Sequence, residues 1–464
     1  MTANGRRQFL DAPLTRRSAL RAGVGLLGLS LPHFFALRPT HAAAALPGYG
    51  KAKSCIVLYC WGGMSQLETW DPKPDAPPEI RGDYRSIQTA TPGVRLGEYM
   101  PLLARQTERL AIVRSMHHRS AAHGKGMYWN ITGHEPADAE QAVNQPPTRA
   151  DWPCLGAMVA RLKPAPHGLP GSVQVPYPLV DNHTLQAGDS AGWLGQGYDP
   201  VIVRPAAGRP YGGVSRDLGV PVLKPADDVD PQRLQARLNL ANALEADRAA
   251  APPTPGFDHY RQMAYDMLSS AKVRAAFDVT REEPRLRDRY GDHICGQSVL
   301  LARRLTEAGV SLVSVICAAG DLNNAAGDHW DTHSNAFNRL RNDLLPPFER
   351  ALSALLDDLA DRGRLDETLV VVLTEFGRTP KWTGTGRDHY PLCYSVALAG
   401  GGVRGGQVYG RSDRHAALPQ DQPTGPAYVH ATIFHALGIP LDTQLIDNQG
   451  RKLSLTDGTP LPLF

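Results

Sequence analysis

Five short, largely apolar runs constrain the fold of this 464-residue chain more strongly than any other feature. Each run is four to seven residues long, and none alternates strictly between apolar and polar positions. Such runs are typical of strands that are buried on both faces, as in a parallel sheet covered by helices. The five predicted strands are residues 54–60, 110–113, 310–316, 368–374 and 394–399.

Helical patterns separate these runs. Asp230-Pro231 supplies a cap followed by a proline in the first turn, and a glycine follows several of the other predicted helices. The alternation predicts an α/β fold with a mostly parallel central sheet and helices on both faces. The predicted helices run from about 230 to before 252 and cover about 259–277, 293–308, 347–362 and 428–437.

The mature chain is expected to form one large domain over residues 46–464, although a chain of this length could hold two. Strand–helix alternation resumes after an irregular stretch, which favours a single domain. That stretch, at about 164–256, is rich in proline and glycine and is interpreted as an insertion that lies over the sheet edge. The sequence shows no internal repeat and no stable transmembrane segment.

Residues 1–45 have the features of an export signal. Arg16-Arg17 precedes a short apolar run, which Pro32 and His33 interrupt, and small residues end the segment. The twin-arginine pattern predicts the twin-arginine translocase as a partner and a periplasmic or secreted location. The alternative is a basic amphipathic helix that belongs to the domain itself.

The net charge of +3 comes from this leader, which holds six arginines and one acid. The rest of the chain has 43 basic and 45 acidic residues. Composition therefore gives no support for nucleic-acid binding, and none is predicted.

Three loops that follow predicted strands are rich in residues that can bind metals. In open parallel sheets, the loops at the carboxyl ends of the strands build the active site. Carboxylates and imidazoles that converge there predict a divalent metal site, with zinc, manganese or calcium expected. The alternative is that these residues only cap helices, form turns or pair in salt bridges. The candidates are Ser65, Glu68 and Asp71 after the first run, Asp331 and His333 after the third, and Glu375, Arg378, Arg387, Asp388 and His389 after the fourth.

A further cluster, His117, His118 and His123, follows the run at 110–113. Three histidines within seven residues could face the same crevice. They could equally belong to a solvated loop that opens a helix.

Several motifs match a known family, in family order, from about residue 54 to the C-terminus. The most specific are TEFGRTP at 374–380, GRDH at 386–389 and AGGGVRGG at 399–406. Others lie at 62–74, 277–284, 300–309, 330–333 and 447–451. On these motifs the sequence resembles the bacterial domain-of-unknown-function family 1501, which is placed in the alkaline phosphatase/sulfatase superfamily.

The resemblance implies an alkaline-phosphatase-like α/β fold with two metals and a set of ligands. Asp331 and His333 resemble the superfamily's central Asp…His pair, Glu375 the acid after a later strand, and His389 the final histidine. Two positions depart from the pattern. Phe376 stands where a ligating histidine is usual, and Cys60-Trp61 stands where the first strand normally ends in a ligating aspartate, which leaves Glu68 or Asp71 as substitutes.

These observations predict an exported metal-dependent hydrolase of phosphate or sulfate esters. Its expected substrate is a small anionic ester or a sulfated or phosphorylated glycan. Metal-activated Ser65 or water would attack the ester, and Arg378 or Arg387 would orient the anion. Without a Cys-x-Pro-x-Arg or Ser-x-Pro-x-Arg stretch, a formylglycine sulfatase is not expected. The alternatives are a non-catalytic periplasmic or surface binding protein with an incomplete metal site, and a serine esterase.

Overall fold

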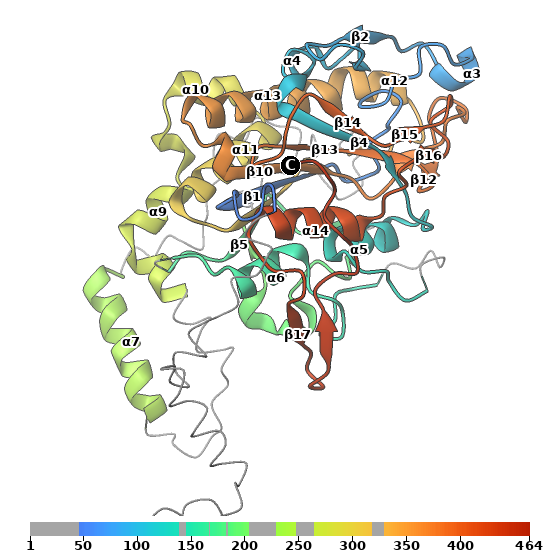
Figure 1. Ribbon diagram of the computed structural model, residues 1–464. Coiled ribbons are helices and arrows are strands. Elements are labelled where there is room, and N and C mark those ends of the chain that lie inside the picture. The colour runs from blue at the N-terminus through green and yellow to red at the C-terminus, as the bar shows by residue number, and fades with distance from the viewer. Residues whose placement is uncertain are drawn as a thin grey trace, which may run out of the picture. The chain divides into compact units, whose positions relative to one another are not determined.

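The predicted strands come together in one eight-stranded sheet at the centre of the protein (Figure 1). The computed structural model describes residues 46–138, 145–166, 168–181, 184–203, 229–246, 264–317 and 329–464. The predicted leader, residues 1–45, lies outside them. In spatial order the strands are β14 (Gln407–Tyr409), β4 (Leu110–Met116), β13 (Tyr394–Ala399), β10 (Thr368–Leu373), β1 (Ser54–Tyr59), β9 (Leu312–Ile316), β5 (Ser172–Val175) and β8 (Val201–Ile202).

The sheet is mostly parallel, as predicted. β1 pairs in parallel with β10 on one side and with β9 on the other, so that Val57 lies opposite Val371 and Ser314. Only β13 runs against its neighbours, β10 and β4. Every residue of β1, β10 and β13 is buried, which explains why these segments are largely apolar rather than apolar only at alternate positions.

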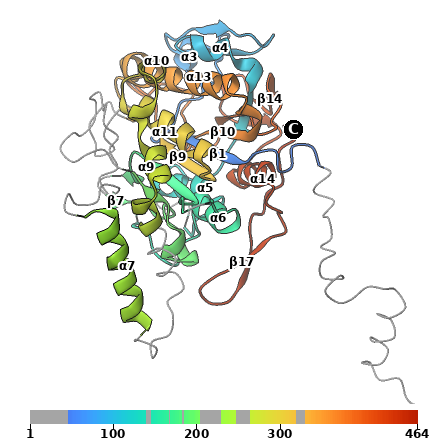
Figure 2. The same ribbon diagram turned by 90° about the vertical axis from the view of Figure 1, so that its left-hand side faces the viewer.

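Helices cover both faces of the sheet (Figures 1 and 2). On one face α11 (Ile294–Ala308) packs against α13 (Leu345–Asp361), with α10 (Pro284–Tyr290) and α9 (Ala271–Phe277) beside them. On the other face lie α5 (His123–Thr132), α6 (Leu155–Leu162) and α14 (Pro426–Ala436). The remaining helices are α3 (Pro78–Arg81), α4 (Pro101–Ala104), α7 (Pro231–Ala246) and α12 (Ala336–Asn338).

Helix ends follow the cap signals in the sequence, with one exception. α11 begins after His293, whose side chain accepts a hydrogen bond from Gly296 N, and ends at Gly309 in a left-handed conformation. The single helix predicted over 259–277 is wrong. Residues 264–269 are helical, and Ser270 then breaks the run because its side chain accepts from Val273 N and caps α9. Residues 259–263 lie outside the described part.

The irregular stretch at 164–256 does more than lie over the sheet edge. It supplies β5, which pairs with β9, and β8, which pairs with β5. Residues 167, 182–183, 204–228 and 247–256 of this stretch are outside the described part.

Within the part of the chain that the structure describes, five two-stranded ribbons lie outside the sheet. None of the described helices combines the length and the apolar composition that crossing a bilayer requires. The ribbons are β2–β3 (Ser86–Gln88, Arg95–Gly97), β6–β7 (Val180–Asp181, Thr184–Leu185), β11–β12 (Gly377–Arg378, His389–Tyr390), β15–β16 (Arg411–Ser412, Pro419–Asp421) and β17–β18 (Gln444–Ile446, Lys452–Ser454).

Candidate metal centre

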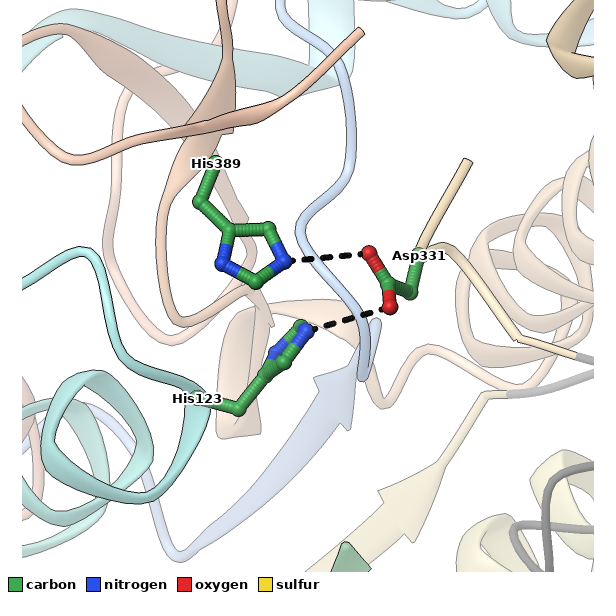
Figure 3. A group of neighbouring side chains, drawn as sticks. All are labelled: His123, Asp331 and His389. Atoms are coloured by element: carbon green, nitrogen blue, oxygen red, sulfur yellow. Dashed lines mark hydrogen bonds and ion pairs between the residues drawn. The ribbon is translucent and has the colours of Figure 1, made fainter. Parts of the chain in front are cut away.

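Two histidines and an aspartate from three distant segments meet at one edge of the sheet (Figure 3). His123 is the first residue of α5, which follows β4. Asp331 lies on the segment that follows β9, and His389 lies in β12, between β10 and β13. One ligand atom of each of the three lies within 4.8 Å of the others. They meet because β4, β9 and β10 run in the same direction, so the segments leaving their carboxyl ends reach the same edge.

Asp331 is at the centre of this group. Its Oδ1 lies 2.6 Å from Arg378 Nη2, 3.0 Å from His333 Nε2 and 3.2 Å from His389 Nε2. Its Oδ2 lies 3.3 Å from His123 Nε2. Three imidazoles and one guanidinium therefore converge on a single carboxylate. We call His123, Asp331, His333 and His389 the Asp331 cluster.

Each imidazole of the cluster has its other nitrogen held by an oxygen. His123 Nδ1 lies 2.8 Å from Glu375 Oε1, His333 Nδ1 lies 2.8 Å from Asp388 Oδ1, and His389 Nδ1 lies 2.7 Å from the Ala121 carbonyl. An Nδ1–H that donates to such an oxygen leaves the lone pair on Nε2, which faces Asp331. Metal-binding histidines are usually oriented in this way.

The donor set fits a divalent cation. His333 Nε2 and His389 Nε2 are 2.8 Å apart, and two lone pairs at that separation repel unless a proton or a cation lies between them. His123 Nε2 is buried, and the Asp331 carboxylate lies 3.3 Å from it.

Formal charge supports the same conclusion. The carboxylates of Asp331, Glu375 and Asp388, with the Arg378 guanidinium, leave a net charge of −2 around neutral imidazoles. A divalent cation would neutralise that charge.

Without a cation, protons take its place. Burial opposes a charge on His123, but hydrogen bonds to Asp331 and Glu375 outweigh it and raise the pKa of His123 to about 9. Burial also opposes ionisation of Asp331, yet hydrogen bonds from His123, His333 and His389 hold the pKa of its carboxyl far below the usual range. The hydrogen bond to Asp331 raises the pKa of His333, whereas burial lowers that of His389.

Packing fixes the His123 ring between two aromatic side chains. The ring is stacked on Trp61 at 5.3 Å between centroids and tilted against Phe376 at 4.9 Å. Glu375, which orients this ring, is itself buried, and its Oε1 also accepts from Gly62 N at 2.7 Å.

Gly62 makes the close approach to the cluster possible. Its φ is +111°, and a Cβ there would lie 2.3 Å from Asp331 N. Only glycine allows the end of β1 to pass this close to the backbone that presents Asp331.

Five residues predicted for the site are brought together by the structure: Asp331, His333, Glu375, Asp388 and His389. Asp331, His333 and His389 face one another directly. Glu375 and Asp388 instead lie behind His123 and His333, where they hold Nδ1 atoms.

The expected role of Arg378 as an anion clamp is corrected. Its side chain is fully buried, and it donates to Asp331 and to the carbonyls of Gly62, Gly63 and Arg387. With its N–H groups engaged in this way, Arg378 fixes Asp331 and does not face a substrate.

Ser65 and Arg387 are likewise not accessible for their predicted roles. Ser65 is buried and donates to Glu68 Oε2, so it is not presented as a nucleophile. Arg387 is buried and pairs with Glu68 at 2.6 Å while donating to the carbonyls of Ile80, Thr379 and Pro380.

Asp71 is not a ligand of the cluster either. It is buried beside Lys73 at 2.9 Å and accepts a hydrogen bond from Ser412. Like Glu68, it is committed to a structural ion pair.

His123 is a member of the cluster that the sequence does not single out as a candidate ligand. Of the three clustered histidines, His118 holds the Glu375 carbonyl at 2.5 Å and His123 enters the cluster. The available signal was position, because His123 follows a predicted strand at the same sheet edge as the other candidates.

Comparison with models of protein families shows the family to which the chain belongs. A family model described as "Protein of unknown function (DUF1501)" matches residues 52–462. The chain belongs to this family. No curated protein matches the sequence.

Among solved structures, the DUF1501 chain is similar to Ps i-CgsB in complex with k-i-k-neocarrahexaose. The identity is 10%, 87% of this chain and 74% of that chain are covered, and the TM-score is 0.42. It is also similar to a protein in the alkaline phosphatase superfamily from Vibrio parahaemolyticus. The identity is 10%, 85% of this chain and 68% of that chain are covered, and the TM-score is 0.40. A third similar structure is the phosphonate monoester hydrolase SpPMH from Silicibacter pomeroyi. The identity is 15%, 88% of this chain and 76% of that chain are covered, and the TM-score is 0.35. At these TM-scores, we base the function on the chemistry of the Asp331 cluster.

Proposed function

We propose that this protein is a metal-dependent hydrolase of phosphate or sulfate esters. One observation carries the proposal: three imidazoles, each with its Nδ1 held by an oxygen, direct Nε2 toward the Asp331 carboxylate. Histidines that bind a metal are usually held in this way, with the second ring nitrogen donating to an oxygen.

His123, Asp331 and His389 would hold the cation, with His333 beside them. Three imidazoles and one carboxylate favour zinc or manganese, because calcium prefers sites made only of oxygen ligands. When bound, such a cation withdraws charge from an ester oxygen and acidifies water.

The chain's own residues supply the remaining chemistry. Since Ser65 is buried against Glu68, water is the nucleophile: its oxygen forms the new bond to phosphorus or sulfur as the bond to the leaving oxygen breaks. His333 has 44% of its side chain exposed, and Asp388 holds its Nδ1. His333 Nε2 keeps its lone pair and is thus the group that takes a proton from the attacking water and passes it to the leaving oxygen.

Export by the twin-arginine translocase to the periplasm or outside the cell is part of the proposal. It rests on Arg16-Arg17 and the apolar run that follows them. A translocase that carries folded proteins would suit a metal inserted before export.

A non-catalytic binding protein is the second candidate. The observation in its favour is Phe376, whose ring stacks on His389 at 4.7 Å between centroids, at a position where the family resemblance implies a ligand. A centre with fewer ligands could bind a ligand without turning it over.

Metal analysis of the purified protein tests the proposal. We expect near-stoichiometric zinc or manganese and hydrolysis of p-nitrophenyl phosphate or sulfate. Both should be lost in His389→Ala and retained in His415→Ala, a control histidine on a loop outside the cluster. Bound metal without hydrolysis would favour the binding protein. Metal-free wild-type protein that cannot be loaded would refute the metal centre.

A further inference from the structure

A pocket of about 620 Å³ is lined in part by the start of α5, where Gly124, the residue after His123, contributes to its wall. Its volume is within the range of about 300–1,000 Å³ typical of ligand sites. Arg119 and three residues of α5, Gly124, Lys125 and Tyr128, form one side. The rest of the lining is Glu135, Pro136, Ala137, Asp138, Gln145, Ala150, Asp151, Trp152, Gln186 and Ala187.

The stretch from Arg119 to Tyr128 connects this pocket to the Asp331 cluster. The Ala121 carbonyl holds His389 Nδ1, and His123 is itself a member of the cluster. The residues on either side, Arg119 and Gly124, face the pocket. The same short segment thus contributes residues to the Asp331 cluster and to the lining of this pocket.

One polar group in the pocket lacks a partner. Gln186 is fully buried, and its Nε2 donates to the Thr184 carbonyl at 2.7 Å. Its Oε1 has no hydrogen-bond partner within the part of the chain that the structure describes. An unpaired buried amide oxygen is unfavourable unless a ligand or water completes it.

Lys125, which lines the same pocket, offers unused donors. The side chain is nine-tenths buried, and among the described residues its Nζ donates to the Ala137 carbonyl at 2.9 Å. An ammonium group has three donors, so two remain.

The lining indicates what kind of ligand completes these groups. It carries three acids against two bases, and Glu135 pairs with Arg119. A second anionic group is therefore not what it selects. Amide and carboxylate oxygens accept from hydroxyls, Lys125 donates to them, and Trp152 and Tyr128 add apolar surface. This combination suits a hydroxyl-rich, uncharged group.

We propose that this pocket is a saccharide subsite, so that the substrate is an esterified glycan rather than a small ester. The inference rests on the proposed function. The esterified group would lie at the Asp331 cluster and a neighbouring uncharged sugar in the pocket, with a sugar hydroxyl donating to Gln186 Oε1.

Binding of uncharged saccharides by the intact protein tests the subsite without requiring hydrolysis. Probes are agarose-, cellulose- and chitin-derived tetrasaccharides, titrated by calorimetry. We expect at least one to bind, and Gln186→Leu to weaken it by about tenfold, the loss expected for one hydrogen bond. Because Gln186 is buried, Gln145→Ala provides an exposed second variant with the same expected direction. Gln420→Ala, an exposed glutamine on β16, is the control.

Hydrolysis separates failure of the subsite from failure of the enzyme proposal. Gln145→Ala should lower the preference for a sulfated or phosphorylated oligosaccharide over the p-nitrophenyl ester by about fivefold or more, mainly through KM. Saccharide binding without any hydrolysis would support the subsite and refute the hydrolase. Hydrolysis with no saccharide binding, or with an unchanged preference in both variants, would overturn the subsite.

Discussion

Zinc affinity of the Asp331 cluster should rise steeply with pH. In the metal-free protein, burial opposes charge on His123, but Asp331 and Glu375 raise its pKa to about 9. Since Glu375 accepts from Nδ1, the proton that must leave for a metal to bind is the one on Nε2, which faces Asp331.

The size of the effect follows from that pKa. Below pH 9, each drop of one pH unit lowers the neutral fraction of His123 about tenfold, and the zinc affinity falls by the same factor. Between pH 6.5 and 8.5, the affinity should therefore rise about 100-fold, or ~2.7 kcal/mol, from His123 alone. The pKa of His333 is also raised, so the slope could only be steeper from this second group.

Competition with a chromophoric zinc chelator over this pH range measures the slope. Loss of His123 as a ligand in His123→Ala should weaken binding and remove about one proton from the slope, whereas His415→Ala should leave both unchanged. A zinc affinity that is constant from pH 6.5 to 8.5 would refute the reasoning, because binding would then displace no proton.

Three other predictions test the surroundings of the cluster. The pKa of His123 is raised on folding from about 6.5 to about 9, so this group stabilises the metal-free protein most fully below pH 6.5. In urea denaturation with EDTA, the free energy of unfolding should fall by about 3 kcal/mol as the pH rises from 6.5 to 9. A free energy of unfolding that stays constant over this range would contradict the prediction. Arg378→Met removes the buried guanidinium that pairs with the partly buried Asp331 carboxylate, and should cost about 3 kcal/mol in urea denaturation and lower the metal content. Ser65→Ala removes only a hydrogen bond to Glu68, so it should cost ~1 kcal/mol and retain hydrolysis; an inactive, metal-loaded variant would restore Ser65 as nucleophile.

The sheet could be predicted largely because its strands are buried on both faces. β1 and β10 are apolar at every position after the first and stand out in the sequence. β5 was missed because Ser172–Val175 is a short run with alternating polar residues, flanked by proline and glycine. Its burial arises from its tertiary position between β9 and β8, which no local pattern records.

Part of the Asp331 cluster could be predicted because the carboxyl ends of parallel strands lie at the same side of the sheet. Asp331 and His389 were found on that basis. Burial was not predictable in the same way: Ser65 and Arg387 occur in the right loops but pair with Glu68. Glu68 is only three residues from Ser65 but 319 residues from Arg387, and the local sequence does not specify that Arg387 pairs with it.

His123 shows a different limit. Whether a histidine cluster opens toward a crevice or toward solvent depends on how α5 packs, and here α5 places its first residue against Asp331. The glutamate that orients it, Glu375, comes from the segment after β10. That pairing only emerges once β4 and β10 are placed in one sheet.

A crystal structure of the metal-loaded protein, with anomalous diffraction recorded at the zinc and manganese absorption edges, tests the central claim most directly. We predict one anomalous peak bonded to His123 Nε2, Asp331 and His389 Nε2 at distances of about 2.0–2.2 Å. Absence of any peak after soaking, with His123, His333 and His389 remaining hydrogen-bonded to Asp331, would contradict it.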